Sequence, residues 1–276
     1  MLRRSTRGRS AFVILSGVLL SALVLGRLGI PTVSSEGMMI RSHLVNGDLP
    51  SSPEDPAWES IPAFVIPLSG QVITRPVWPE PSAKALTVRS LHNGTDIAFL
   101  LEWQDNTKND RLTPGTFRDG AAVGLPLGDA PAFFCMGQLD HYINIWHWKA
   151  DWQSDIDRRS ARTSEGKGKT GEVRRFEVIP RRASSVEDLV GGGFSTLTSK
   201  QSQGRVQGKA VWKEGTWKVV MQRPLESTDP ENEARLAPGR IQAIAFAIWN
   251  GENKERNGQK AIAPWFQLAI DPVLKT

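Results

Sequence analysis

The most informative segment for the fold, residues 241–270, consists of IQAIAFAIWN (241–250), GENKERNGQK (251–260) and AIAPWFQLAI (261–270). Two apolar runs flank ten residues of amide, glycine and charged side chains. Short apolar runs bounded by turn residues predict β-strands. The polar ten residues are either an exposed hairpin tip or a loop that caps a site and sends one side chain inward.

Similar runs recur toward the N-terminus. The predicted strands there cover residues 61–68, 85–91, 95–103, 119–127, 205–213 and 216–223. Asn93-Gly94 and Glu214-Gly215 join two pairs of these strands, and such dipeptides are strong hairpin signals. Because many short strands occur with turn residues between them and without a strong helical period, we predict an all-β fold. It is an antiparallel β-sandwich with long loops and few short helices.

The domain boundaries follow from composition. Residues 31–56 contain several Ser and Pro and predict a linker, after which residues 57–276 form one folded domain. Within it, residues 160–203 are rich in Ser, Thr, Gly, Lys and Arg and predict an insertion with a short helix around 185–190. Such a segment is either a plain surface loop or a docking element for a partner subunit.

The N-terminus predicts export. Residues 1–10 are positively charged and residues 11–26 are apolar, so residues 1–30 read as a signal peptide or short membrane anchor, a hydrophobic helix that precedes the sandwich. The positive-inside rule then places the rest of the chain on the periplasmic side of a bacterial inner membrane. Five of the 34 basic residues lie in the first thirty, which hold no acidic residue, so the remainder carries 29 charges of each sign. The high pI thus reflects targeting rather than a nucleic-acid surface.

The sequence excludes several kinds of site. The single cysteine, Cys135, excludes internal disulfides, four-cysteine zinc or iron–sulfur sites and covalent c-type haem attachment. Hydrolytic motifs such as GxSxG and HExxH are absent, so no catalytic residue is assigned. His141 and His147 have an even spacing that would place both on one face of a strand. They are either a pair of metal ligands or ordinary packing.

Met136 lies in the apolar run FFCMG at residues 133–137. A methionine in such a run either fills the core or borders a ligand. Gly137 permits close backbone approach, and three tryptophans follow within sixteen residues, at Trp146, Trp148 and Trp152. A flat hydrophobic ligand would fit such a wall.

Five segments carry a resemblance to a known family. They are residues 134–137, NIWHWK at 144–149, AIWNGENKERNGQKAIAPWF at 247–266, LEWQD at 101–105 and DGAAV at 119–123. Together they resemble the haem b-binding γ subunits of the complex-iron–sulfur molybdoenzymes, a cytochrome c-552 and DMSO reductase-like haem-binding domain. The dehydrogenases of ethylbenzene and dimethylsulfide, selenate and chlorate reductases and nitrite oxidoreductase have such subunits. The likeness covers residues 61–270 apart from the insertion, and the segment 247–266 is its most specific part.

The resemblance implies one haem b whose iron is held between a methionine and a lysine, here Met136 and Lys260. A thioether is a soft neutral ligand, and a lysine ligates iron only as the neutral amine, which burial and the ferric charge favour. Lys254 and Lys149 are the rival lysines. Lys260 is preferred because it borders the apolar run 261–265, so residues 257–261 should fold inward while 252–256 stay in water. Arg256 or Lys254 would face the haem propionates.

The implied function is electron transfer without catalysis by this chain. The partners would be a molybdopterin catalytic subunit and an iron–sulfur subunit, with a soluble cytochrome or the quinone pool as external carrier. Two alternatives stay open on the sequence alone. One is a carbohydrate-binding β-sandwich without redox work, and the other is a free, membrane-tethered b-type cytochrome.

Overall fold

The computed structural model describes residues 39–133, 136–165, 181–201 and 203–273, which all fall within one compact unit. The signal or anchor helix predicted for residues 1–30 lies outside the described residues. Strand is the dominant secondary structure of the described chain, with many strands against one α-helix and one short 3-10 helix, so the all-β prediction is confirmed. Within the described ranges, no helix has both the length and the apolar character needed to cross a membrane.

The strands in chain order are β1 (Met39–Leu44), β2 (Phe64–Pro67), β3 (Ser69–Gly70), β4 (Ala85–His92), β5 (Asp96–Gln104), β6 (Gly120–Pro126), β7 (Ile143–Lys149), β8 (Val186–Gly191), β9 (Thr198–Ser199), β10 (Gln207–Lys213), β11 (Thr216–Pro224), β12 (Ile241–Trp249), β13 (Ala261–Ile262) and β14 (Phe266–Ile270). The helical elements are η2 (Pro56–Ser60) and α1 (Ala150–Glu165). The predicted hairpins β4–β5 and β10–β11 both form. Glu214 and Gly215 each have positive φ, as a two-residue hairpin turn of the primed type requires.

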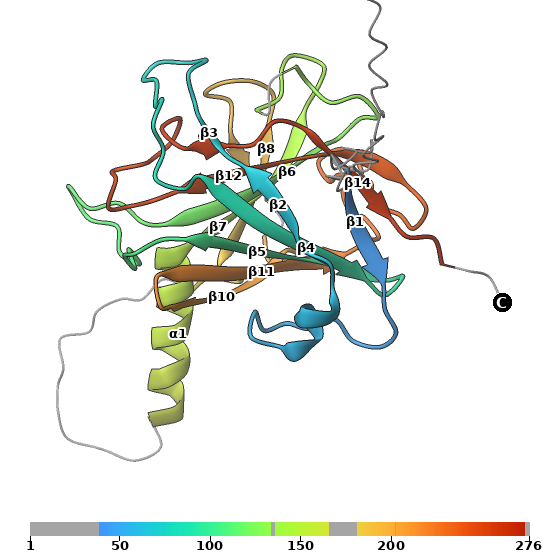
Figure 1. The fold of residues 1–276 in the computed structure, drawn as a ribbon, viewed down its shortest axis with the longest axis horizontal. Helices are drawn as coiled ribbons and strands as arrows, with labels where there is room; N and C mark the ends of the chain where they lie inside the picture. The colour runs from blue at the N-terminus through green and yellow to red at the C-terminus, as the bar shows by residue number, and fades with distance from the viewer. Residues whose placement is uncertain (1–38, 134–135, 166–180, 202, 274–276) are drawn as a thin grey trace, which may run out of the picture. The chain divides into compact units, whose positions relative to one another are not determined.

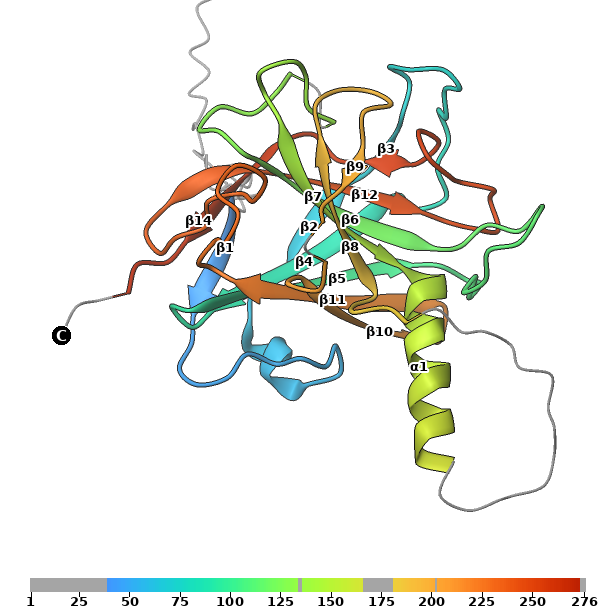
Figure 2. The ribbon, with the colours of Figure 1, turned by 180° about the vertical axis from the view of Figure 1, so that it is seen from behind.

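The strands form two layers (Figures 1 and 2). The first layer has the order β10-β11-β5-β4-β1-β14, with β2 paired to β4. The second has the order β12-β6-β7-β8-β9, with β13 on β12 and β3 on β13. Strand β12 belongs to both layers, because residues 241–244 pair with β14 and residues 245–249 pair with β6.

One strand corrects two predictions. β1 lies in the range predicted as linker, and it is parallel to both β4 and β14, so the sheet is mixed rather than purely antiparallel. Its side chains alternate, with Ile40 and Ser42 buried. Inserted between β4 and β14, it satisfies backbone groups that those strands would otherwise leave unpaired. Composition could not reveal this, because both pairing partners are distant in sequence.

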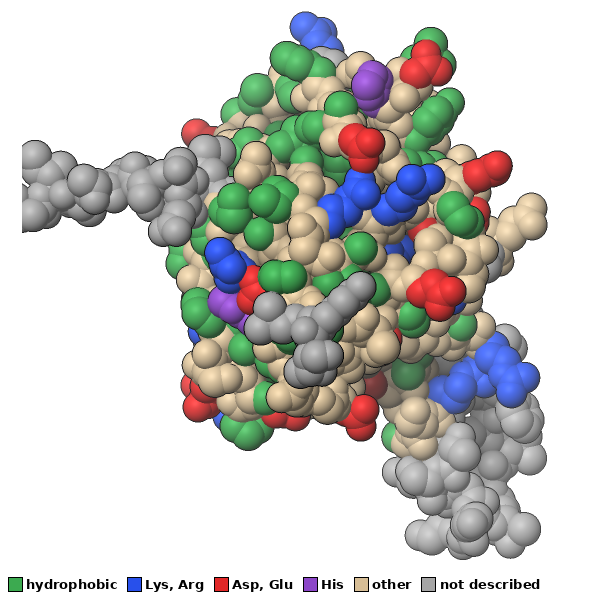
Figure 3. All heavy atoms as spheres, turned by 90° about the vertical axis from the view of Figure 1, so that its right-hand side faces the viewer, with side chains coloured by type: hydrophobic (Ala, Val, Ile, Leu, Met, Phe, Trp, Pro, Cys, Tyr) green, Lys and Arg blue, Asp and Glu red, His purple; other side chains and the backbone are tan. Residues whose placement is uncertain are grey.

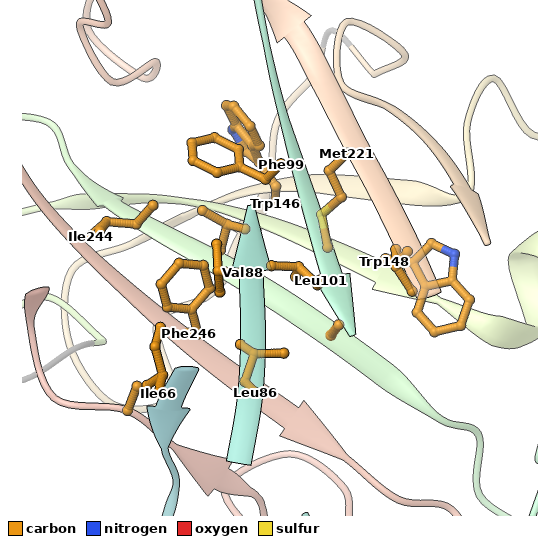
Figure 4. Packing of buried hydrophobic residues seen from close by; sticks show 14 of the residues in the cluster. Ile66, Leu86, Val88, Phe99, Leu101, Trp146, Trp148, Met221, Ile244 and Phe246 are labelled. Carbon is orange, nitrogen blue, oxygen red and sulfur yellow. The ribbon is translucent and has the colours of Figure 1, made fainter. Parts of the chain in front are cut away.

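The core lies between the two layers. Figure 4 shows side chains of β4, β5 and β11 meeting those of β7 and β12, with Leu101 and Met221 opposite Trp146 and Trp148. Trp148 contacts the ring of Trp217 edge-on, with ring centroids 4.9 Å apart. The large inward side chains fill this space, so a ligand site must lie elsewhere.

The segment predicted as an insertion is largely part of the fold. The short helix predicted around residues 185–190 is wrong, because these residues belong to β8, which pairs with β7 from Trp148 to Ile143. The polar content of this strand misled the prediction. Asp188 is buried in β8, where the ammonium of Lys200 lies 3.1 Å from its carboxylate. The helix of the region, α1, begins earlier, at Ala150, and spans sixteen residues.

The surface in Figure 3 carries both signs of charge. On that face Lys and Arg side chains alternate with Asp and Glu, and hydrophobic side chains are scattered between them. This agrees with the equal numbers of acidic and basic residues after residue 30. This face therefore does not present a large area of a single charge sign to a partner.

Candidate cofactor-binding site

A cavity of about 1220 Å³ opens on the outer face of the second layer. Its floor consists of the side chains that point away from the core. They are Gly120, Ala122 and Gly124 of β6, Ala245, Ala247 and Trp249 of β12, Ile145, His147 and Lys149 of β7, and Glu187 and Leu189 of β8. Successive strand residues face opposite sides, so the same strands face the core with their other residues. The small side chains of β6 and β12 make the centre of this floor flat.

Loops from several parts of the chain form the walls. They come from the β3–β4, β5–β6, β6–β7, β8–β9, β12–β13 and β13–β14 connections. Most lining groups are apolar, among them Phe133, Phe194, Ile262 and Trp265. Ligand sites in proteins commonly occupy about 300–1,000 Å³ and are mainly apolar with a few placed polar groups. This cavity is large enough for a tetrapyrrole.

Met136 and Lys260 meet in this cavity. Lys260 Nζ lies 3.2 Å from Met136 Sδ, although the residues are 124 positions apart in the sequence. Lys260 is buried, with 7% of its surface exposed, and its Nζ lies 4.9 Å from the centroid of the Trp249 ring. One loop thus delivers a thioether and another an amine to the same point. The two residues that the sequence singled out as a ligand pair are placed side by side.

Two tryptophans hold the loops that carry this pair. Trp249 Nε1 donates to the carbonyl of Asn257, three residues before Lys260, at 3.1 Å. Trp265 Nε1 donates to the carbonyl of Ala132, four residues before Met136, at 2.8 Å. The indole at the end of β12 and the indole just before β14 therefore anchor the loops that carry Lys260 and Met136.

The polar decapeptide is not an exposed hairpin tip. Glu252, Lys254 and Arg256 are exposed as predicted, but Glu255 in the same stretch is buried with 1% of its surface exposed. Its carboxylate accepts from Asn250 N, Ser82 N and the indole Nε1 of Trp78. The prediction that residues 252–256 all stay in water is therefore wrong for Glu255, because a charged side chain can be buried when several donors surround it.

A pair of buried aspartates supports the start of this loop. Asp119 accepts from Gly251 N at 2.8 Å, and Asp105 accepts from Asn250 Nδ2 at 3.0 Å. Burial, with repulsion from Asp105, raises the pKa of Asp119 to about 7. Burial also raises the pKa of Asp105. In the sequence both aspartates belong to the motifs LEWQD and DGAAV, but no local signal indicates their role. The alternation of small residues in GAAVG and AIAFA was the overlooked sign of the flat floor.

The histidines do not form the alternative metal pair. His147 lines the cavity and stacks on Trp249, with ring centroids 4.6 Å apart. Burial, with repulsion from Lys149, lowers the pKa of His147 well below its usual value. His141 is exposed and precedes β7, which begins at Ile143. Among the described residues, His, Cys, Asp and Glu side chains form no group of three or more able to hold a metal ion.

The rival lysines have other positions. Lys149 lines the cavity but is ion-paired with Glu187, and its Nζ lies 4.4 Å from the centroid of the Trp152 ring. Burial lowers the pKa of Lys149, and the hydrogen bond to Glu187 opposes that shift. Lys254 is exposed, and the cavity lining skips from Trp249 to Glu255. Of these lysines, Lys260 is the one in contact with a second side chain able to ligate iron.

The arrangement fits haem on three structural grounds. A soft sulfur and an amine converge in one cavity, which suits an iron of low-spin character. The floor of Gly and Ala residues accepts a flat ring, and the surrounding walls are apolar.

Cys135 and Phe134 lie outside the described residues.

Comparison with known proteins identifies relatives. A family model described as ethylbenzene dehydrogenase matches residues 55–261. A Haloferax mediterranei protein named as a respiratory nitrate reductase heme subunit is 29% identical over 227 residues, covering 82% of this chain and 70% of that protein. The chlorate reductase subunit gamma of Ideonella dechloratans is 27% identical over 237 residues, covering 83% and 84% of the two chains. The dimethylsulfide dehydrogenase subunit gamma of Rhodovulum sulfidophilum is 25% identical over 239 residues, covering 81% and 76%.

Among solved structures, a family 9 carbohydrate-binding module of Caldicellulosiruptor kristjanssonii, in complex with cellotriose, aligns with a TM-score of 0.45 and 8% identity. The alignment covers 86% of this chain and 95% of that one. A similarity of this size carries no argument about the ligand.

Proposed function

We propose, from the premise that this chain belongs to the ethylbenzene dehydrogenase family, that it is a haem b electron-transfer subunit of a molybdenum oxidoreductase. Met136 and Lys260 would be the axial ligands. The observation that carries this proposal is the 3.2 Å approach of Met136 Sδ and Lys260 Nζ inside the cavity. The names of the three relatives, one a heme subunit and two gamma subunits, support it.

The ligand pair favours electron transfer over catalysis. When bound, haem supplies one reversible electron, and side chains at both axial positions leave no open place for a substrate. As an iron ligand, the thioether of Met136 would stabilise ferrous iron and raise the reduction potential of the bound haem. Lys260 is buried in the cavity, and a lysine ligates iron through the lone pair of its neutral amine. The chain therefore holds and tunes an electron carrier.

The partners follow from the same family membership. We infer a molybdopterin catalytic subunit and an iron–sulfur subunit, with a soluble cytochrome or the quinone pool as external carrier. Four large exposed hydrophobic side chains also line the cavity: Ile73, Leu112, Phe133 and Leu197. Each comes from a different loop, and Phe133 is 82% exposed. Exposed apolar side chains gathered around a site suit protein docking, so we place a partner at the cavity mouth.

We also propose that the domain works outside the cytoplasm. The basic residues 1–10 and the apolar residues 11–26 support export to the periplasmic side of a bacterial inner membrane, with residues 1–30 as a cleaved signal or an anchor. Fusion of residues 1–60 to a reporter that is active only after export tests this. An inactive fusion would contradict it.

The ligand assignment is tested by reconstitution with haem. Purified wild-type protein should bind one haem and give the absorption spectrum of a low-spin, six-coordinate b-type cytochrome. Met136→Ala and Lys260→Ala should each convert it to a high-spin or otherwise changed spectrum, while the exposed Lys254→Ala leaves it unchanged. The assignment fails if both ligand variants keep the wild-type spectrum. Failure of the wild type to bind haem would overturn the proposed function itself.

A further inference from the structure

The cavity has two chemically different ends. At one end of the strands Gly120 pairs with both Lys149 and Trp249, and at the other end Gly124 pairs with Ile145 and Ala245. The first end carries the charged lining residues of the floor, Lys149 and Glu187, and Arg118 joins it two residues before β6 begins. The second end is apolar. Any ligand with one polar and one apolar edge is therefore oriented by this cavity.

Two arginines occur beside Phe117 at the charged end. Arg118 follows Phe117 directly in the chain, and the guanidinium carbon of Arg256 lies 4.5 Å from the centroid of the Phe117 ring. Arg118 Nη1 donates to Asp151 at 3.0 Å, and Arg256 Nη1 donates to the carbonyl of Lys254 at 2.8 Å. Both arginines line the cavity. An arginine has five N–H donors in a fork that matches a carboxylate, so each keeps donors for a ligand.

Two charged groups of the cavity floor, Lys149 and Glu187, are already matched. Glu187 is ion-paired with Lys149 and accepts from the Ser199 hydroxyl at 2.7 Å, so its charge is compensated. The ammonium of Lys149 is occupied by the same ion pair. Arg256 is exposed, and it contacts the carbonyl of Lys254 and the ring of Phe117. Arg256 therefore offers positive charge to an incoming anion, as does Arg75, which is exposed and also lines the cavity, while Arg118 shares its charge with Asp151.

We propose that Arg256 and Arg118 bind the two propionate carboxylates of the tetrapyrrole and so fix its orientation in the cavity. This rests on the proposed function, because it concerns how the same cavity holds haem. The propionate edge faces Phe117 and the solvent, and the apolar edge faces Ile145 and Leu189. Charge-assisted N–H···O bonds from arginine are among the stronger hydrogen bonds in proteins.

The experiment compares haem with haem dimethyl ester, in which both carboxylates are neutral. Affinities of wild type, Arg256→Gln and Arg118→Gln for each compound are measured by absorbance titration of the full domain. We expect Arg256→Gln to weaken haem binding by about five- to tenfold and ester binding by less than about twofold. The exposed Lys254→Gln, in the same loop but outside the lining, should bind both compounds like wild type. Equal losses for haem and its ester in Arg256→Gln would overturn the proposal.

Two further readouts separate this inference from the ligand assignment. Arg256→Gln should keep the low-spin spectrum of the wild type, because neither axial ligand changes, and should lower the reduction potential because a nearby positive charge is lost. Arg118→Gln also leaves Asp151 without its arginine, so Arg118→Lys is the second variant and should restore most of the haem affinity. If wild type binds no haem, the proposed function fails. If it binds haem but Arg256→Gln and Arg118→Gln bind as wild type does, this inference alone fails.

Discussion

The two faces of β6 and β12 carry opposite kinds of side chain. Toward the core, β6 presents Val123 and Leu125 and β12 presents Phe246, all buried in the main cluster. Away from the core, the same strands present Gly120, Ala122, Gly124, Ala245 and Ala247 to the cavity, with the large Trp249 at the end of β12. Large inward side chains stabilise the sandwich, while small outward ones leave room for a cofactor. In these two strands, the residues that face the core stabilise the fold, and the alternate residues that face outward shape the binding cavity.

The largest effect should come from emptying the inward face. Trp148→Ala removes a fully buried indole that contacts Trp103 and Trp217, and such changes cost about 3–5 kcal/mol of unfolding free energy. Chemical denaturation monitored by fluorescence measures the loss. A loss below about 1 kcal/mol would mean that the inward face does not carry the stability.

The next largest effect should come from filling the outward face. A Cβ at Gly124 would have only the carbonyl oxygen of Ala245 within 4 Å, at 3.8 Å, so Gly124→Leu fits the fold and projects into the cavity. We expect haem affinity to fall about 10- to 100-fold because the ring must repack, with unfolding free energy changed by less than about 1 kcal/mol. Gly128→Leu, in an exposed loop, is the control. Unchanged haem affinity in Gly124→Leu would show that the ring does not lie on this floor.

Asp119 joins the two regions and should make stability depend on pH. Its carboxylate accepts from Trp217 Nε1 in the core and from Gly251 N in the ligand loop. Because the folded-state pKa is raised to about 7, the folded protein prefers the protonated form. Its contribution to stability is therefore full at low pH and declines as pH rises from about 4 to 7, by on the order of 4 kcal/mol in total.

The measurement is unfolding free energy between pH 4 and pH 8 for wild type and Asp119→Asn. The decline assigned to Asp119 should be absent in the variant, so the difference between the two proteins should change with pH across that window. Parallel pH profiles for the two proteins would contradict the assignment.

The smallest effect should separate loop anchoring from packing. Trp265→Phe keeps an aromatic ring but loses the 2.8 Å bond to Ala132, and Trp58→Phe, in η2 and outside the cavity lining, loses a comparable 3.1 Å bond to Ser52. Each should cost about 1 kcal/mol of stability. Only Trp265→Phe should also weaken haem binding, by about two- to fivefold, because it frees the loop of Met136. Equal haem affinity in both variants would show that Trp265 does not position that loop.

Much of the fold could be predicted from sequence because its signals are local. The dipeptides Asn93-Gly94 and Glu214-Gly215 are enough to predict the two hairpins, and the apolar run IQAIAFAIW is enough to predict strand β12. Strands β1 and β8 were missed because their partners are remote and their polar residues are satisfied only in three dimensions. Asp188 in β8, for example, needs Lys200 beside it.

The candidate site shows the same division. Met136 and Lys260 could be chosen from a motif resemblance, and they lie 3.2 Å apart in the structure. The residues that support them could not be chosen, because nothing local distinguishes Asp119 or Glu255 from a solvated acid. Their role depends on donors contributed by distant segments, such as Trp217 for Asp119 and Trp78 for Glu255.

The most direct test of the account is a crystal structure of the haem-loaded protein with anomalous diffraction measured at the iron absorption edge. The account predicts one iron peak in the cavity, bonded to Met136 Sδ on one side of the ring and to Lys260 Nζ on the other. An iron bonded instead to His147, which lines the same cavity, or a haem held outside this cavity, would contradict it.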